Sequence, residues 1–223
     1  MVANFLINLE FIIAGLVDGT MKYMEITQLK LFTMTIFLEQ AVKKNLITMI
    51  YTNAPPAVAP HGALKTLFGT NPICFGTPTG SKVPFILDTS ISMINRGKIR
   101  VAARNNQTIP AGVALDKFGK PTTDAKKALE GVQLPIAGFR GSGLAWMVDI
   151  LSGVFTGGNH GGKVKDPFDD FSGPQNIGHL FIVMKSNLFV KNFNSRIKEN
   201  IRRVKKLPKL KNIKGKVRLH GVA

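Results

Sequence analysis

Residues 83–90 read VPFILDTS, an apolar run that ends in a carboxylate and two hydroxyl groups. The apolar residues at 83–87 predict a buried strand that ends at Asp88. At the end of a strand, Asp88, Thr89 and Ser90 suit the hydroxyl groups of a ribose or a sugar-like ligand. A helix cap explains them equally well, because Asp and Ser both accept hydrogen bonds from the first N–H groups of a helix. On these residues alone, both interpretations stay open.

Strands and helices alternate on both sides of this stretch. Further strands are predicted at 46–51 (LITMIY) and 177–184 (IGHLFIVM). Helices are predicted at 38–45, from Thr123 or Asp124 to Leu129 with Gly131 ending it, at 143–155 and at 195–206. The helix at 143–155 is apolar nearly all round, which is typical of a helix buried in the core. The pattern indicates a chain of mixed α/β or α+β class, a sheet with helices.

Charge is concentrated at one end of the chain. The 223 residues carry a formal charge of +17, and residues 191–223 hold twelve basic residues against one acidic residue, Glu199. Such a segment can bind nucleic acid or an anionic membrane by counterion release, or it can be a solvated helix face. We favour the solvated face, because no aromatic residue beyond Phe193 and no nucleic-acid motif accompanies the charge.

Cysteine use and the N-terminal residues bear on the compartment. Cys74 is the single Cys, so neither an intramolecular disulfide nor a structural zinc site of several thiolates can form. Residues 1–17 are apolar, but they include Asn4, Asn8 and Glu10 and lack a basic start. They therefore fit neither a spanning helix nor a signal peptide. We expect a cytoplasmic protein without a membrane partner.

Two further groups of residues carry weak chemical signals. Residues 138–143 (GFRGSG) look superficially like a phosphate loop but do not match the dinucleotide fingerprint G-x-G-x-x-G. Either the glycines only turn the chain into the next helix, or Arg140 binds a phosphate beside the N-terminus of that helix. The four His residues, at 61, 160, 179 and 220, have no metal-ligand spacing, so we expect no metal site.

Longer motifs follow one another in order over roughly residues 38–196. They are TNAPPAVAP at 52–60, GTNP at 69–72, FILDTS at 85–90, RGKI at 96–99, IPAG at 109–112, GKPTTD at 119–124, LPIAGFRGSGL at 134–144, DILSGVFTG at 149–157 and NIGHLF at 176–181. Each is weak alone, but the ordered series resembles the malate/L-lactate dehydrogenase family. That family includes ureidoglycolate dehydrogenase, sulfolactate dehydrogenase and piperideine-2-carboxylate reductase.

The resemblance implies an activity, a fold and an assembly. The activity is interconversion of a small 2-hydroxy acid and a 2-oxo acid with NAD or NADP. The fold is a non-Rossmann α+β fold, here incomplete, and the assembly is a homodimer.

The resemblance also assigns roles to residues. It places Thr70 against the substrate. It places the following residues at the cofactor: Thr52, Asn53, Ala54, Asp88, Thr89, Ser90, Arg96, Gly97 and Arg140. Arg140 stands where the family usually has Lys, so a cation is retained with a different geometry.

Two stretches depart from the family pattern. The family's Ser-His-Gly motif is absent from residues 1–37, a second His motif is absent from residues 28–37, and no Pro-Gly-Glu segment follows residue 217. Reduction of a carbonyl needs a proton donor and a cation for the carboxylate, so no catalytic residue is assigned.

We therefore expect an enzyme truncated at both ends and impaired in turnover. The chain divides into a divergent segment (1–37), a cofactor-binding body (38–190) and a basic helix and tail (191–223). The alternatives are a non-catalytic nucleotide-binding remnant or, less favoured, a basic nucleic-acid-binding protein.

Overall fold

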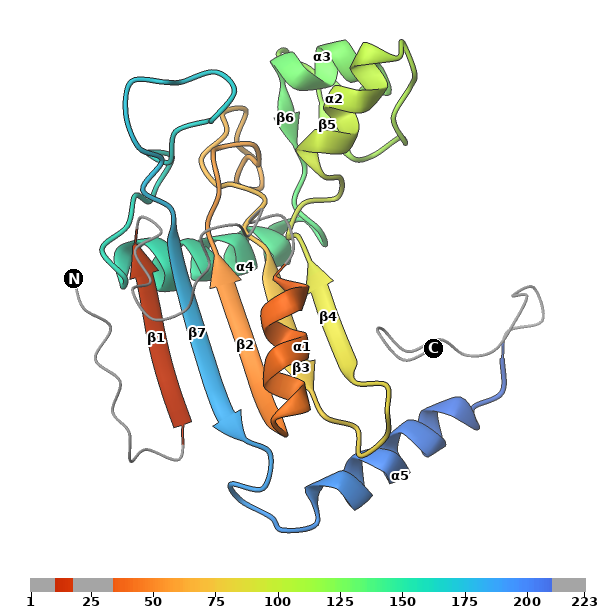
Figure 1. The fold of residues 1–223 in the computed structure, drawn as a ribbon. Helices are drawn as coiled ribbons and strands as arrows, with labels where there is room; N and C mark the ends of the chain where they lie inside the picture. Colours follow the sequence, from red (N-terminus) through yellow and green to blue (C-terminus); the bar gives the residue numbers. More distant parts are fainter. Residues whose placement is uncertain (1–10, 18–33, 210–223) are drawn as a thin grey trace.

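The computed structural model describes residues 11–17 and 34–209. Its centre is a five-stranded antiparallel sheet in the order β1-β7-β2-β3-β4 (Figure 1). The strands are Phe11–Val17 (β1), Leu46–Thr52 (β2), Ile73–Thr77 (β3), Phe85–Thr89 (β4) and Gly178–Lys185 (β7). The predicted strands at 46–51 and 177–184 are confirmed. The strand predicted at 83–87 instead begins after Pro84, which has no N–H to donate to the ladder, and runs to Thr89. The prediction that it is buried is wrong, because β4 is an edge strand and its residues are half-buried or exposed.

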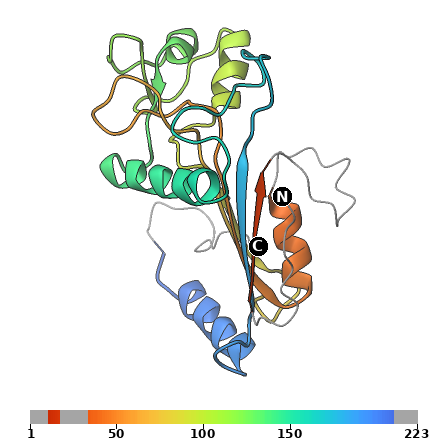
Figure 2. The ribbon, with the colours of Figure 1, turned by 90° about the vertical axis from the view of Figure 1, so that its left-hand side faces the viewer.

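Helices cover both faces of the sheet (Figure 2). Helix α1 (Thr35–Lys43) packs on one face over a core of Met34, Leu38, Ile50, Cys74 and Phe181. Helix α4 (Phe139–Asp149) crosses the other face and continues as a π-helical segment, η1 (Ile150–Val154). A second core of Phe68, Ile91, Ala145 and Val148 lies beneath α4. The α+β fold is confirmed, and the antiparallel sheet differs from a doubly wound parallel one.

The prediction of a helix at 143–155 buried on all sides is wrong. The helix begins earlier, at Phe139, and only one side of it meets the sheet, through Ala145 and Val148. The other side is exposed, with Trp146 at 61% and Phe155 at 70% of their full accessibility. A helix that crosses a sheet has one face to bury, so apolar composition all round did not indicate burial all round.

A small unit with its own core stands beyond the end of β4 (Figure 1). It contains α2 (Arg96–Arg104), α3 (Ala125–Glu130) and a two-stranded ribbon of β5 (Ala114–Leu115) and β6 (Val132–Gln133). Its buried residues are Ile99, Ala102, Ile109, Val113, Ala114, Ala125 and Ala128. The predicted cap of α3 is confirmed, because the Asp124 carboxylate accepts from the N–H groups of Lys126 and Lys127.

The chain leaves the sheet through helix α5 (Phe193–Lys205), which projects from the body (Figure 1). Ile197, Ile201 and Val204 are half-buried on one stripe and the basic residues are exposed, which confirms the predicted amphipathic helix. Across the described ranges, no helix has the length and apolarity needed to cross a membrane. Most of the divergent segment 1–37 and the tail beyond residue 209 lie outside the described residues.

Candidate functional site

The predicted cofactor loop starts at a buried pair of side chains. Thr52 ends β2 and His179 lies opposite it in β7, with a hydrogen bond of 2.8 Å between Thr52 Oγ1 and His179 Nδ1. Both residues are buried. Burial lowers the pKa of His179 to about 4, because the imidazolium loses its hydration. The ring is therefore neutral at pH 7 and fixes the end of β2.

Asn53 is locked on both sides of its amide group. Its Oδ1 accepts from the N–H of Gly178 at 3.0 Å, its Nδ2 donates to the carbonyl of Asn159, and the residue is fully buried. Ala54 donates its N–H to Asn71 Oδ1 at 3.2 Å. Asn71 in turn donates to the carbonyl of Ala145 in α4 at 2.8 Å. The side chain of Asn53 is thus committed to protein groups, and the loop at 52–54 is held rigidly.

Thr70 joins this loop to the end of β4. It is half-buried, and its carbonyl accepts from the N–H of Ile91 at 2.8 Å. The preceding Gly69 lies so close to Ala54 that a Cβ on it would be 2.3 Å from the Ala54 carbonyl oxygen. Two predicted cofactor segments, 52–54 and 88–90, therefore flank the predicted substrate residue at one end of the sheet.

Asp88 is turned toward α1. One carboxylate oxygen accepts from Thr35 Oγ1 at 2.9 Å and the other from Cys74 Sγ at 3.3 Å. Burial of the thiol, and secondarily the neighbouring carboxylate, raise the pKa of Cys74 far above its ordinary value. Asp88 nevertheless remains exposed, so it keeps the capacity to accept hydrogen bonds from a ligand.

The hydroxyl groups that follow β4 form a directed chain. Ser92 Oγ donates to the carbonyl of Ile94 at 2.7 Å, and Ser90 Oγ lies 3.2 Å from Ser92 Oγ. Thr89 Oγ1 donates to the carbonyl of Ser90 at 3.3 Å. Since Ser92 has one proton and uses it on Ile94, Ser90 is the donor to Ser92. These hydroxyls are left as acceptors toward a ligand.

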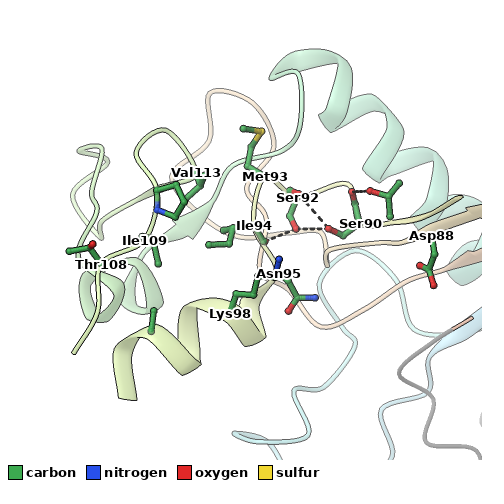
Figure 3. Close-up of a pocket in the computed structure, with 13 residues that line it drawn as sticks. Asp88, Ser90, Ser92, Met93, Ile94, Asn95, Lys98, Thr108, Ile109 and Val113 are labelled. Carbon is green, nitrogen blue, oxygen red and sulfur yellow. Dashed lines mark hydrogen bonds between the residues drawn. The ribbon is translucent and has the colours of Figure 1, made fainter. Parts of the chain in front are cut away.

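These groups line a cavity of about 620 Å³ between the sheet end and the small unit (Figure 3). Its walls combine polar and apolar side chains. The lining residues are Asp88, Thr89, Ser90, Ser92, Met93, Ile94, Asn95, Lys98, Ala102, Thr108, Ile109, Pro110 and Val113. A volume of this size is in the range that holds small-molecule ligands. The structure therefore brings the predicted residues 88–90 into a single cavity.

Arg96 and Gly97 lie in the first turn of α2, between the lining residues Asn95 and Lys98, but do not line the cavity themselves. The Asn95 side chain caps the helix by accepting from the N–H of Gly97 at 2.7 Å. Arg96 Nε is 3.9 Å from Asp166. Arg100, one turn later, binds Asp166 at 3.0 Å, so α2 is tied to the loop that precedes β7.

Arg140 is not among the residues that line the cavity. It is exposed in the first turn of α4, after Gly138, whose φ of 58° only glycine adopts readily. Sequence reasoning did not single out Ser92, Lys98 or Thr35 as site residues. Two signals in the sequence could have found Lys98 and Ser92. Lys98 falls inside the RGKI motif at 96–99, and Ser92 is only two residues beyond Ser90 at the end of the strand.

Comparison with known proteins supports a relationship over most of the chain. Residues 30–222 match the family model described as malate/L-lactate dehydrogenase. The (2R)-3-sulfolactate dehydrogenase (NADP(+)) of Chromohalobacter salexigens is 37% identical over 145 residues, 65% of this chain and 44% of that protein. The malate/(S)-sulfolactate dehydrogenase of Methanothermus fervidus is 36% identical over 171 residues, 76% of this chain and 50% of that protein.

Solved structures agree with the fold. A dehydrogenase from Sinorhizobium meliloti superposes with a TM-score of 0.82 at 26% identity, covering 95% of this chain and 59% of that chain. The sulfolactate dehydrogenase of Methanocaldococcus jannaschii gives a TM-score of 0.68 at 36% identity, covering 80% and 52%. The chain spans about half the length of the curated relatives it matches.

Proposed function

The chain belongs to the malate/L-lactate dehydrogenase family, and we propose that it binds NAD or NADP and serves the interconversion of a 2-hydroxy acid and a 2-oxo acid. The observation that carries the proposal is the cavity at the end of β4. It combines hydroxyl and carboxylate acceptors with an apolar wall and one ammonium group. A nucleotide offers the complementary set of ribose hydroxyls, an apolar base and phosphate.

The residues present fit such a cofactor in distinct ways. Asp88 and Ser90 accept hydrogen bonds from ribose hydroxyls, because the donor of Ser90 is already used on Ser92. The loop at 52–54 does not line this cavity, but it is held rigidly by His179 and by the amide of Asn53, and it stays a proposed cofactor contact. Arg96, Gly97 and Arg140 lie on the first turns of two helices, where they stay proposed contacts for phosphate.

The bound nicotinamide would supply or accept the hydride, and the chain's own residues would hold the acid beside it. Thr70 is the proposed substrate contact, because it lies between the two cofactor segments. We assign no proton donor. Among the described His residues, His179 is neutral and bonded to Thr52, which suits a positioning role.

We propose that turnover by this chain alone is weak or absent. Reduction of a 2-oxo acid requires a group that protonates the developing alkoxide and a cation that pairs with the carboxylate. The sequence contains no His before His61 to match the family's catalytic His. The test is the oxidation of NADH and NADPH by purified chain with pyruvate, oxaloacetate or sulfopyruvate. A robust, protein-dependent rate would contradict impairment and confirm the oxidoreductase activity.

A second candidate function is non-catalytic nucleotide binding. The same cavity favours it, since its lining needs no proton donor to bind a cofactor. Calorimetric titration with NADH and NADPH, combined with the rate assay, distinguishes the enzyme from the non-catalytic binding protein. The binding protein should bind a cofactor without turnover. Nucleic-acid binding through the basic residues after Lys191 is a third and weaker candidate, tested by salt-dependent binding to random duplex DNA.

We propose a homodimer as the assembly. The exposed apolar side chains of α4 and η1, such as Trp146, Val154 and Phe155, provide surface of the kind that subunits bury. Light scattering of the purified chain tests the proposal, and a monomer at micromolar concentration would contradict it.

A further inference from the structure

The two charged groups that line the cavity come from different elements, Asp88 from β4 and Lys98 from α2 (Figure 3). Asp88 lies at the sheet end, where its carboxylate is bound to Thr35 and Cys74. Lys98 extends from α2 toward the segment that carries Ser92 and Asn95 (Figure 3). An anion placed in this cavity would be repelled by Asp88 and attracted to Lys98.

Lys98 is also the one basic residue among those that line the cavity. No carboxylate in the described part of the chain lies within 4.0 Å of its ammonium group. The nearby Arg96 and Arg100 face Asp166 instead. The charge of Lys98 is thus the one left for a ligand in this cavity.

The three hydroxyl groups that follow β4 already use their protons, and the other side-chain donors of the lining, the Thr108 hydroxyl and the Asn95 amide, carry no charge. The protons of Thr89, Ser90 and Ser92 are used within the segment 89–94, as the directed chain above requires. Phosphate oxygens only accept hydrogen bonds, so they need donors. Lys98 supplies three N–H groups and a positive charge.

The apolar residues beside Lys98 indicate which phosphate of the cofactor would lie at its ammonium group. Ala102 is one turn after Lys98 on α2, and Ile94, Ile109 and Val113 complete the wall beside it. A flat base against this wall lies next to Lys98. The phosphate closest to the base of NADP is the 2′-phosphate of its adenosine ribose, whereas the diphosphate extends from the 5′ side.

We propose that Lys98 binds the 2′-phosphate and makes this chain prefer NADP over NAD. The proposal rests on the proposed function, because it assumes that the cavity takes the adenosine half of the cofactor. Lys98 acts here as a specificity-determining residue, with no role in hydride or proton transfer.

Calorimetric titration with adenosine 2′,5′-diphosphate and with ADP tests this without any turnover. The native chain should bind the 2′-phosphorylated compound about tenfold or more tightly, as expected for charged hydrogen bonds. Lys98→Gln should abolish this preference and leave ADP affinity within about twofold, and Lys98→Arg should restore part of it. Lys126→Gln, an exposed Lys on α3 that does not line the cavity, is the matched control and should keep the preference.

The contrary results are distinguishable. Equal affinities for the two compounds in the native chain, or a preference that survives Lys98→Gln, would refute the role of Lys98 and leave the proposed function intact. An equal weakening of both compounds would place the 5′-diphosphate at Lys98 and refute the 2′-phosphate assignment. Absence of binding to either compound by folded chain, checked by circular dichroism, would refute both this inference and the proposed cofactor site.

Discussion

Thr52 and His179 are 127 residues apart in sequence, yet Thr52 Oγ1 and His179 Nδ1 lie 2.8 Å apart at the buried end of β2 and β7. The pairing joins the loop that we propose as a cofactor contact to β7, an inner strand of the sheet. Because His179 is 8% exposed and neutral, its protonation is coupled to folding.

Stability should therefore fall at mildly acidic pH. The folded pKa of His179 is about 4 and its unfolded value is about 6.5, so between these values the unfolded state binds the proton and the native state does not. The free energy of unfolding should decrease as pH falls from 6.5 to 4, by at most about 3 kcal/mol from this residue. Urea titrations of native chain and His179→Gln at pH 7 and 5 measure it. An identical pH dependence in both proteins would contradict this role of His179.

Two glycines in α4 provide a matched pair. A Cβ on Gly141 would be 1.7 Å from the carbonyl oxygen of Ile136, whereas a Cβ on Gly143 would have open space around it. Gly141→Ala should destabilise the chain by about 3 kcal/mol or more, since the obstacle is backbone. Gly143→Ala should be neutral or stabilising by up to about 1 kcal/mol, because Ala favours a helix. Thermal unfolding compares the two, and similar melting temperatures would refute the close approach of α4 to Ile136.

The sequence alone predicted the local features and missed the long-range ones. The cap at Asp124 and the stripe Ile197–Ile201–Val204 depend on neighbours in sequence, so their patterns were sufficient. The bond from Gly178 to Asn53 depends on strand register, which no local pattern specifies. For the same reason, residues 88–90 could be placed at a strand end, but Lys98 could not be placed across a cavity from them.

The contacts of Arg100 with Asp166, Asp169 and Phe168 should restrain the loop that precedes β7. Arg100 binds Asp166 at 3.0 Å and Asp169 at 3.4 Å, and its guanidinium lies 4.4 Å from the ring centroid of Phe168. Arg100→Gln should speed hydrogen exchange of amides 163–172 about fivefold, as loss of ~1 kcal/mol implies. The control is Lys117→Gln, which breaks the exposed pair with Glu130 and should leave this loop unchanged. Equal exchange in native chain and Arg100→Gln would show that other contacts hold the loop.

Cys74 should be inert in the folded protein. It is fully buried, and burial together with Asp88 raises its pKa, so the reactive thiolate is scarce at pH 8. An aromatic disulfide reagent should label it only after denaturation, with one thiol released per chain. Rapid labelling of the native chain would contradict the packing of α1 over β3.

The proposed cofactor site is tested most directly by calorimetric titration of the purified, folded chain with NADPH and NADH. The cavity at residues 88–113 predicts saturable binding of one molecule per chain, with NADPH bound more tightly than NADH. Filling the cavity by Ala102→Trp should abolish binding of both; because Ala102 also belongs to the core of the small unit, circular dichroism and thermal unfolding first establish that the variant is folded. Binding of neither cofactor by the native chain at millimolar concentration, or unchanged binding by Ala102→Trp, would contradict the site.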